Sequence, residues 1–386
     1  MFLKLSGDGT WNRLSSPYPT NVVLTTEAVL PRGPDGILQS AYYNEGVGTS
    51  YLVFPKLAAW IGGGFGLGLF DKVADAYRFL VMNYEIGDEI YIFGFSRGAF
   101  TARSLAGMIR NCGIIERGHI DKVPKAVNFY ETRTPDMHPD SEAAKKFRAT
   151  HAYRILMDED EREWRRTKNR ARPELDQLPL FRITFLGVWD TVGALGIPKH
   201  LFFEKIFRTA DKYRFHDTVL SSRVASARHA VAIDEDRKSF APSLWDNLDE
   251  LNEATGNRGE YQQLWFPGDH SSVGGGGDIV GLSADALIWI LEGAERKGLA
   301  LDQERIAALH ERIDCLAPLR NRTEKPGLMA RIYQRAPREG PTLWDDLSPS
   351  AQTRLLSETK SADFVPPYRP KSLERLFPEI ERRRGR

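Results

Sequence analysis

The chain has 386 residues, of which 41% are hydrophobic. This is enough for one large core with inserted segments, because single cores stop growing near roughly 250 to 300 residues. The 53 lysines and arginines nearly balance the 52 aspartates and glutamates. No global charge therefore draws the chain to nucleic acid or to an anionic membrane, so we expect no nucleic-acid partner and, at most, local membrane contact.

Two cysteines, Cys112 and Cys315, are too few for a disulfide framework and lack the spacing of metal ligands. We expect neither a metal nor another cofactor. The first residues, MFLKLSGDGTWN, lack the apolar run of a signal peptide, and no segment has the roughly 18 apolar residues of a membrane-spanning helix. These features predict a cytoplasmic protein; the alternative is export by a needle-like machine that uses no cleavable signal.

Short apolar runs followed by polar or glycine-rich loops predict four buried strands. In chain order they are Phe2 to Leu5, Glu89 to Phe93, Phe181 to Trp189, and Tyr261 to Phe266. Helical patterns predict helices at Asp71 to Asn83, Arg97 to Arg110, Thr218 to Ile233, and Ser283 to Lys297, the last with Ser283 as its N-cap. Alternating strands and helices favour an α/β fold: a doubly wound, mostly parallel sheet like that of α/β-hydrolases. Ligands bind such sheets beyond the carboxyl ends of the strands.

Two charged regions interrupt this alternation. We expect residues 1–300 to form a catalytic domain with a helical insertion at about 123–178, and residues 301–386 to form a helical, Pro/Arg-rich extension that packs on it or trails behind it. Solvated surface explains both regions. The alternatives are a cap over the active site and a surface that docks a partner.

The pentapeptide Gly94-Phe95-Ser96-Arg97-Gly98 fits G-x-S-x-G, the nucleophile elbow in which a strained strand-to-helix turn lifts a serine above the sheet. Gly94 and Gly98 leave room for neighbouring backbone. A predicted strand ends just before the motif and a predicted helix follows it, as the motif requires. Ser96 is therefore the candidate nucleophile; the alternative is a serine that caps an ordinary helix.

A serine nucleophile needs a base and an acid that orients the base. His270 follows a predicted strand, in a glycine-rich loop at the carboxyl end of the sheet. Asp190 follows another strand and gives the chain order serine, acid, histidine that is typical of α/β-hydrolases. Asp234, Asp269 and Asp278 are alternative acids. Asp269 is adjacent to the histidine and Asp278 follows it, so these two fit less well.

The oxyanion hole of such a site uses the backbone N–H after the nucleophile, here that of Arg97, and a second N–H from a neighbouring loop. The segment GDGTWN offers Gly9 or Thr10, provided that Phe2 to Leu5 forms an adjacent strand. Asp8 is a candidate for supporting that loop through its side chain. An ordinary turn explains Asp8 and Gly9 equally well.

Seven ordered motifs between Gly7 and Leu299 resemble the α/β-hydrolase family of type VI secretion lipase effectors, first Tle class, which was formerly a domain of unknown function. They are DGTWN, AYYNEGVGT, GGGFGLG, AYRFLVMNYEIGDEIYIFGFSRGAFTAR, FLGVWDTVGALG, RHAVAIDEDRKSFAPSLW and WFPGDHSSVGGG. The resemblance implies that the serine of GFSRGA, Ser96, is the nucleophile and that Asp190 and His270 complete the triad. It also implies cleavage of phospholipid acyl esters.

We therefore expect a serine hydrolase that cleaves carboxylic esters, as a phospholipase or lipase. The expected partners are an ester or phospholipid substrate, a transiently contacted membrane surface, and a secretion-machine or immunity protein. The segment HLFFEKIF, residues 200–207, places apolar side chains on one helical stripe, which fits an acyl-chain groove or simply the core. The alternative functions are a soluble esterase or thioesterase for small substrates and a non-catalytic binding protein that retains the fold.

Overall fold

The computed structural model describes residues 2–7, 16–44, 67–132, 134–168, 173–193, 218–321, 335–361 and 363–385. Three of the sequence predictions lie outside these ranges. They are the loop of Asp8, Gly9 and Thr10, most of the glycine-rich segment at 62–68, and the apolar stripe at 200–207.

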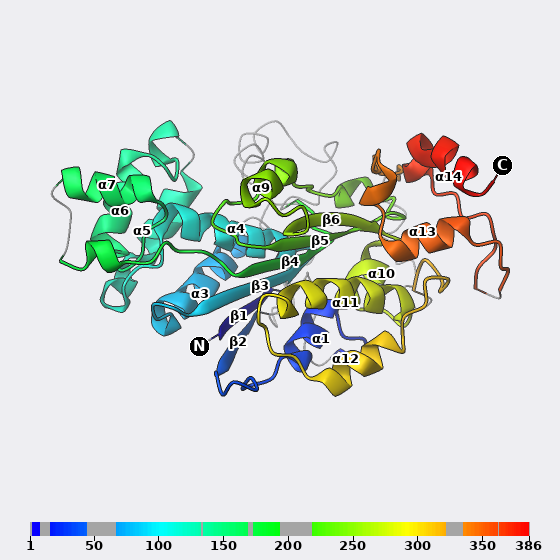
Figure 1. Cartoon of the computed structure of the whole chain (residues 1–386), viewed down its shortest axis with the longest axis horizontal. Helices are drawn as coiled ribbons and strands as arrows, with labels where there is room; N and C mark the ends of the chain where they lie inside the picture. Colours follow the sequence, from blue (N-terminus) through cyan, green and yellow to red (C-terminus); the bar gives the residue numbers. More distant parts are fainter. Residues whose placement is uncertain are drawn as a thin grey trace, which may run out of the picture.

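Six parallel strands form one sheet in the order β2-β1-β3-β4-β5-β6 (Figure 1). Their bounds are β1 Phe2–Gly7, β2 Gln39–Asn44, β3 Glu89–Phe95, β4 Phe185–Trp189, β5 Ala227–Ala232 and β6 Tyr261–Phe266. The strand order changes direction between β1 and β3. In doubly wound sheets this switch point opens a crevice beyond the carboxyl ends of the strands, where ligands bind.

Helices cover both faces of the sheet because side chains alternate along buried strands. Ile90 and Ile92 of β3 pack in one core with α3 (Leu67–Asn83) and α4 (Arg97–Cys112). Tyr91, Phe93 and Phe95 point to the other face and pack in a second core with α1 (Asn21–Ala28) and α11 (Gly281–Glu295). The protein thus has the predicted α/β architecture, and a hydrophobic layer on each face holds β3 in place.

The predicted strands correspond to β1, β3, β4 and β6, although β4 begins four residues later than expected. The helix predicted over Thr218 to Ile233 is wrong, because its second half is strand β5, whose six residues are all buried. Periodicity cannot distinguish a short strand buried on both faces from a buried helical segment. Ser283 is not an N-cap either: α11 begins at Gly281, and the Ser283 hydroxyl donates to the carbonyl of Val280.

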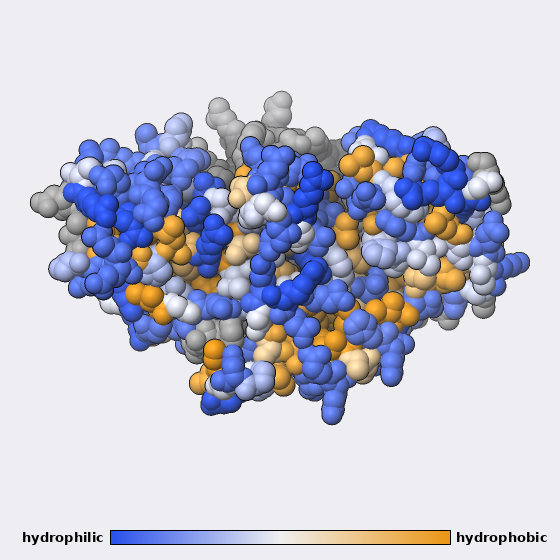
Figure 2. Space-filling model, in the orientation of Figure 1, coloured by the Kyte–Doolittle hydropathy of each residue, from blue (hydrophilic) through white to orange (hydrophobic). Residues whose placement is uncertain are grey.

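The described residues between 117 and 178 form a group of short helices at one end of the molecule (Figure 1). They are η1 Arg117–Lys122, α5 Val123–Glu131, η2 Pro135–Met137, α6 Glu142–His151, α7 Glu159–Thr167 and η3 Leu175–Gln177. Hydrophilic residues dominate their visible surface (Figure 2). Arg148 of α6 donates to the carbonyls of Arg110 and Asn111, so the group packs on the last turn of α4, far from Ser96 at its beginning.

The C-terminal segments pack against the other end of the sheet and build a third hydrophobic cluster with Val231, Ile233 and Trp265. Their elements are η7 Trp344–Asp346, α13 Pro349–Leu356, η8 Lys371–Leu376 and α14 Phe377–Arg383. The remaining elements are η5 Lys238–Phe240, α9 Leu248–Thr255, α10 His270–Gly274 and α12 Gln303–His310.

Among the described residues, no helix combines the length and the apolar character needed to cross a bilayer.

Candidate functional site

Ser96 occupies a sharp turn between β3 and α4 and has a φ of 59°. A positive φ is costly for a residue with a side chain, and such strain is concentrated at functional sites. Close packing requires the first glycine of the motif: a Cβ on Gly94 would lie 2.5 Å from the carbonyl oxygen of Gly98. The Ser96 N–H donates to the carbonyl of Trp189, which ties the turn to the end of β4.

His270 is buried and lies next to the serine. Its Nε2 is 2.8 Å from Ser96 Oγ, and its Nδ1 is 2.6 Å from Asp190 Oδ2. Phe95 and Phe240 flank the imidazole, with ring centroids 4.6 and 4.9 Å away. Because an ionised carboxylate only accepts hydrogen bonds, Nδ1 carries the proton and Nε2 is left to accept the serine O–H.

Asp190 directly follows β4 and has no exposed surface. Its φ of 38° marks a second strained turn. Its N–H donates to the carbonyl of Ala230, while its Oδ1 accepts from the N–H of Ala232, 2.9 Å away. The next residue is held as well, because the Thr191 N–H donates to His229 Nε2. Neighbouring strand β5 therefore fixes the position and the direction of this carboxylate.

Arg338 is a further member of this group, and sequence reasoning did not predict it. Its Nη1 is 2.6 Å from Asp190 Oδ1 and its Nη2 is 2.8 Å from Asp190 Oδ2. Burial acts to raise the pKa of Asp190, but the Arg338 guanidinium and then His270 outweigh it and hold that pKa well below its usual value. Asp190 is therefore ionised at neutral pH.

Burial has the largest effect on the other titratable member, His270. It lowers the pKa of His270 below the ordinary histidine value, against the opposing attraction of the Asp190 carboxylate. The imidazole is consequently neutral near pH 7. A neutral imidazole that accepts from a serine hydroxyl and donates to a carboxylate has the protonation state that a general base needs.

Two of the three alternative acids have other partners. Asp234 accepts from the Tyr368 hydroxyl at 2.6 Å and from the N–H of Gly268. Asp269 caps α10 by accepting from the N–H of Ser272. Asp278 lies eight residues beyond the histidine, whose Nδ1 faces Asp190. Of the predicted acids, the structure brings Asp190 to His270.

The geometry around Arg97 bears on the predicted oxyanion hole. Arg97 is the first residue of α4, so its N–H belongs to the helix end that favours negative charge. β1 pairs with β3, and its last residue, Gly7, lies opposite Gly94. The predicted donors Gly9 and Thr10, and Asp8, lie outside the described ranges.

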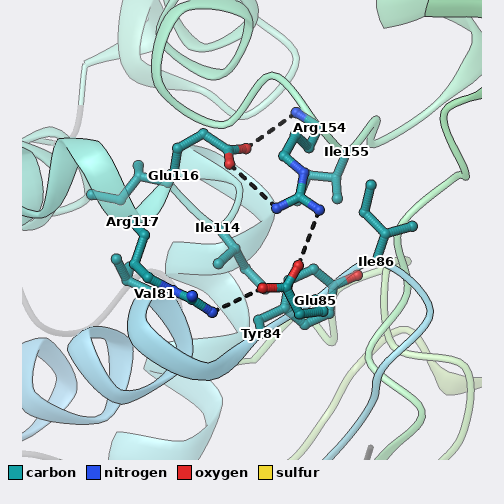
Figure 3. Close-up of a pocket in the computed structure, with 10 residues that line it drawn as sticks. Val81, Tyr84, Glu85, Ile86, Ile114, Glu116, Arg117, Arg154 and Ile155 are labelled. Atoms are coloured by element: carbon teal, nitrogen blue, oxygen red, sulfur yellow. Dashed lines mark hydrogen bonds and ion pairs between the residues drawn. The ribbon is translucent and has the colours of Figure 1, made fainter. Parts of the chain in front are cut away.

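Figure 3 shows the residues that line a cavity, whose volume is about 100 Å³. It is lined by Tyr84 and Glu85, which precede β3, and by Ile114 and Arg154, so it occupies the opposite end of β3 and α4 from Ser96. Arg154 and Arg117 both pair with Glu85, at 3.0 and 2.9 Å. This cavity therefore belongs to the packing of the insertion against the sheet.

In the ranges that the structure describes, no group of three or more His, Cys, Asp or Glu residues is placed to hold a metal ion.

A parallel, doubly wound sheet with a serine on the turn after a central strand defines an α/β-hydrolase-like protein. The family model described as T6SS, phospholipase effector Tle1-like, catalytic domain matches residues 3–293. The chain belongs to this family, as the sequence motifs predicted.

Three individual proteins are also similar to this chain. The uncharacterized protein YEL023C of Saccharomyces cerevisiae is 30% identical over 243 residues, which cover 60% of this chain and 31% of that protein. An uncharacterized protein from Pseudomonas aeruginosa has a crystal structure with a TM-score of 0.43 and 19% identity, covering 82% of this chain and 49% of that one. A Tle1 effector bound to the VgrG spike gives a TM-score of 0.36 and 15% identity, covering 71% and 50%. The chain thus spans about a third of the yeast relative and about half of each solved chain.

Proposed function

We propose that the protein is a serine hydrolase that cleaves the carboxylic esters of phospholipids through Ser96, His270 and Asp190. The observation that carries the proposal is the continuous chain of contacts from Ser96 Oγ to His270 Nε2, at 2.8 Å, and from His270 Nδ1 to Asp190 Oδ2, at 2.6 Å. Membership of a phospholipase effector family supports a lipid ester as the substrate.

Each residue has a distinct role in this mechanism. Ser96 Oγ attacks the ester carbonyl while His270 Nε2 takes the hydroxyl proton; His270 then returns that proton to the leaving alcohol, and an acyl-enzyme remains. Water, deprotonated by the same imidazole, attacks the acyl-enzyme and releases the fatty acid. Asp190 keeps the Nδ1–H tautomer and stabilises the imidazolium.

The tetrahedral oxyanion needs donors that are already in place. We assign one to the backbone N–H of Arg97, at the beginning of α4, and the second to Gly9 or Thr10, with Asp8 supporting their loop. This assignment is supported by the pairing of Gly7 with Gly94, which places the end of β1 beside the strand that leads to Ser96. The mechanism uses no metal or cofactor.

The proposal extends to the organisation of the chain and to its partners. Residues 1–300 form the catalytic domain, and residues 301–386 an extension that packs on it. We also propose delivery by a type VI machine and transient contact with a membrane surface, because the family is one of secreted phospholipase effectors. A secretion-machine partner and a protective immunity protein follow from the same family membership.

Hydrolysis of phospholipid vesicles tests the proposal. Vesicles of phosphatidylethanolamine and phosphatidylglycerol are mixed with the protein and released fatty acid is measured, in parallel with soluble esters of increasing acyl length. We expect release by the wild type and by Ser104→Ala, which removes a buried hydroxyl from the same helix. We expect Ser96→Ala and His270→Ala to lose at least a thousandfold in rate.

Two outcomes would replace the proposal with another. Turnover of short soluble esters without vesicle hydrolysis would identify a soluble esterase or thioesterase. Absence of all turnover in folded wild-type protein would favour a binding protein that retains the fold.

A further inference from the structure

Arg338 comes from the C-terminal extension, beyond the 3–293 span of the family match, and yet it reaches the acid of the proposed triad. The guanidinium is buried and uses its two terminal nitrogens fully. Nη1 donates to Asp190 Oδ1 and to the carbonyl of Ala232; Nη2 donates to Asp190 Oδ2 and to the carbonyl of Phe240. A planar fork makes this set of contacts, and a lysine ammonium cannot reproduce it.

These contacts fix the orientation of the carboxylate. Asp190 Oδ2 is shared between Arg338 and His270, and Oδ1 between Arg338 and the N–H of Ala232. The guanidinium thus holds both oxygens at once. A carboxylate fixed in this way presents Oδ2 to the imidazole in one direction only, and such orientation is what the acid of a triad provides.

The charges around His270 show a second effect. Two carboxylates face it: Asp190 at Nδ1, and Glu235, whose Oε2 accepts the His270 backbone N–H at 3.4 Å. Each carboxylate is paired with an arginine, Asp190 with Arg338 and Glu235 with Arg237. Ser96, Phe95 and Phe240 also contact the imidazole and carry no charge, while Asp269, which precedes His270 in the chain, caps α10. A positive charge beside each carboxylate opposes the attraction that would otherwise favour the imidazolium, and Arg237 is one such charge that lowers the pKa of His270.

We propose that Arg338 is a positioning residue of the active site, which fixes the Asp190 carboxylate and balances its charge so that His270 stays neutral and able to accept the Ser96 proton. The C-terminal extension is then a part of the working site. The catalytic consequence rests on the function proposed above, whereas the effect on His270 can be measured without any turnover.

The test compares four proteins: the wild type, Arg338→Gln, Arg338→Lys and the control Arg335→Gln. Arg335 belongs to the same segment but is half exposed and pairs with Asp236 at the surface. The His270 ring is titrated by NMR in each protein, with its signal assigned by comparison with His270→Gln. The dependence of kcat/KM on pH is measured with a soluble ester, and circular dichroism confirms that each variant is folded.

We expect Arg338→Gln to raise the titration midpoint of His270 by about one pH unit, because a positive charge near the histidine is lost. We expect kcat to fall by about tenfold to a hundredfold, because the carboxylate is no longer held. Arg338→Lys keeps the charge without the fork, so its midpoint stays near that of the wild type while kcat falls. Arg335→Gln matches the wild type in both measurements. Guanidinium ion at sub-denaturing concentration restores turnover in Arg338→Ala.

The proposal is overturned if Arg338→Gln keeps both the wild-type midpoint and the wild-type kcat. If Arg338→Gln does not fold, Arg338→Lys decides: undiminished turnover overturns the proposal. If the wild type hydrolyses no ester, the proposed function fails, and the NMR midpoints alone decide whether Arg338 balances the charge on His270.

Discussion

Glu161 and Asp190 are both buried carboxylates with arginine partners, and they differ in what else contacts them. Glu161, in the insertion, accepts from Arg148 Nε at 2.8 Å and from Arg165 Nη2 at 2.6 Å. Asp190, just beyond the carboxyl end of β4, accepts from Arg338 and from His270. Neither carboxylate has any exposed surface.

The partners of Glu161 are permanently charged and close in sequence, at separations of 13 and 4 residues. Their remaining donors bind backbone carbonyls such as those of Asn111 and Ile155. This cluster joins helices and contains neither a histidine nor a serine. Asp190 instead contacts a histidine whose second nitrogen faces a serine hydroxyl, so its cluster can transfer a proton. A buried ion pair is thus a structural feature until a titratable group links it to a nucleophile.

The largest expected effect is the loss of activity when Asp190 is changed. Asp190→Asn should lower kcat by about ten-thousandfold, because an amide no longer selects the Nδ1–H tautomer of His270. Asp234→Asn is the matched control, since Asp234 contacts Tyr368 and Gly268 rather than His270, and should keep kcat within a few-fold. Steady-state kinetics with a soluble ester measures both variants. A larger loss in Asp234→Asn than in Asp190→Asn would reverse the assignment of the acid.

The next prediction concerns the insertion, where we expect a change to affect stability and not activity. Glu161→Ala leaves Arg148 and Arg165 buried without their carboxylate, and we expect the free energy of unfolding to fall by about 3 to 5 kcal/mol. The folded fraction should retain its kcat, because the cluster packs on the far end of α4. Urea denaturation and kinetics at low temperature measure the two quantities. A folded Glu161→Ala protein with a hundredfold lower kcat would show that the insertion contributes to the site.

A smaller effect is expected from changing the packing around the histidine. A Cβ on Gly274 would lie 1.9 Å from the Phe95 ring, which itself packs against His270. Gly274→Ala should therefore destabilise the protein by about 1 to 3 kcal/mol and lower kcat by roughly tenfold. Gly118→Ala is the control, because a Cβ there has no neighbour within 4 Å. If the two variants behave equally in thermal melts and kinetics, the packing of Phe95 against His270 does not matter for stability or activity.

The smallest predicted effect concerns pH. Burial lowers the pKa of His270, and the base works only when it is neutral, so kcat/KM should fall as the pH drops through that pKa. The midpoint of this fall should lie below the ordinary histidine value of about 6.5. Kinetics between about pH 4 and 9 measure it, with circular dichroism to confirm folding at each pH. A midpoint above 6.5 would indicate a base that is charged more readily than the structure implies.

Much of the site could be predicted because its residues follow strands. Ser96, Asp190 and His270 each lie within a few residues of the carboxyl end of a buried strand, and parallel strands bring those ends together. Local sequence also specified the turn, since Gly94 leaves the space that the backbone of Gly98 and Ala99 occupies.

Other features could not be predicted from local patterns. Strand β5, ARHAVA, carries an arginine and a histidine, yet all six of its residues are buried, because Arg228 packs over Trp289 and His229 bonds to Gln263. Arg338 is one of several arginines in a charged tail, and 148 residues separate it from Asp190. No periodicity or motif marks such a contact, which arises only when the tail packs on the completed sheet.

The most direct test of the central claim is covalent labelling of the serine. Intact-protein mass spectrometry after treatment with a fluorophosphonate probe compares the wild type with Ser96→Ala, His270→Ala and Ser104→Ala. We predict one adduct on the wild type and on Ser104→Ala, and none on Ser96→Ala or His270→Ala, because the probe reacts with a serine that a base has activated. An adduct that persists in Ser96→Ala, or its absence from folded wild-type protein, would contradict the account.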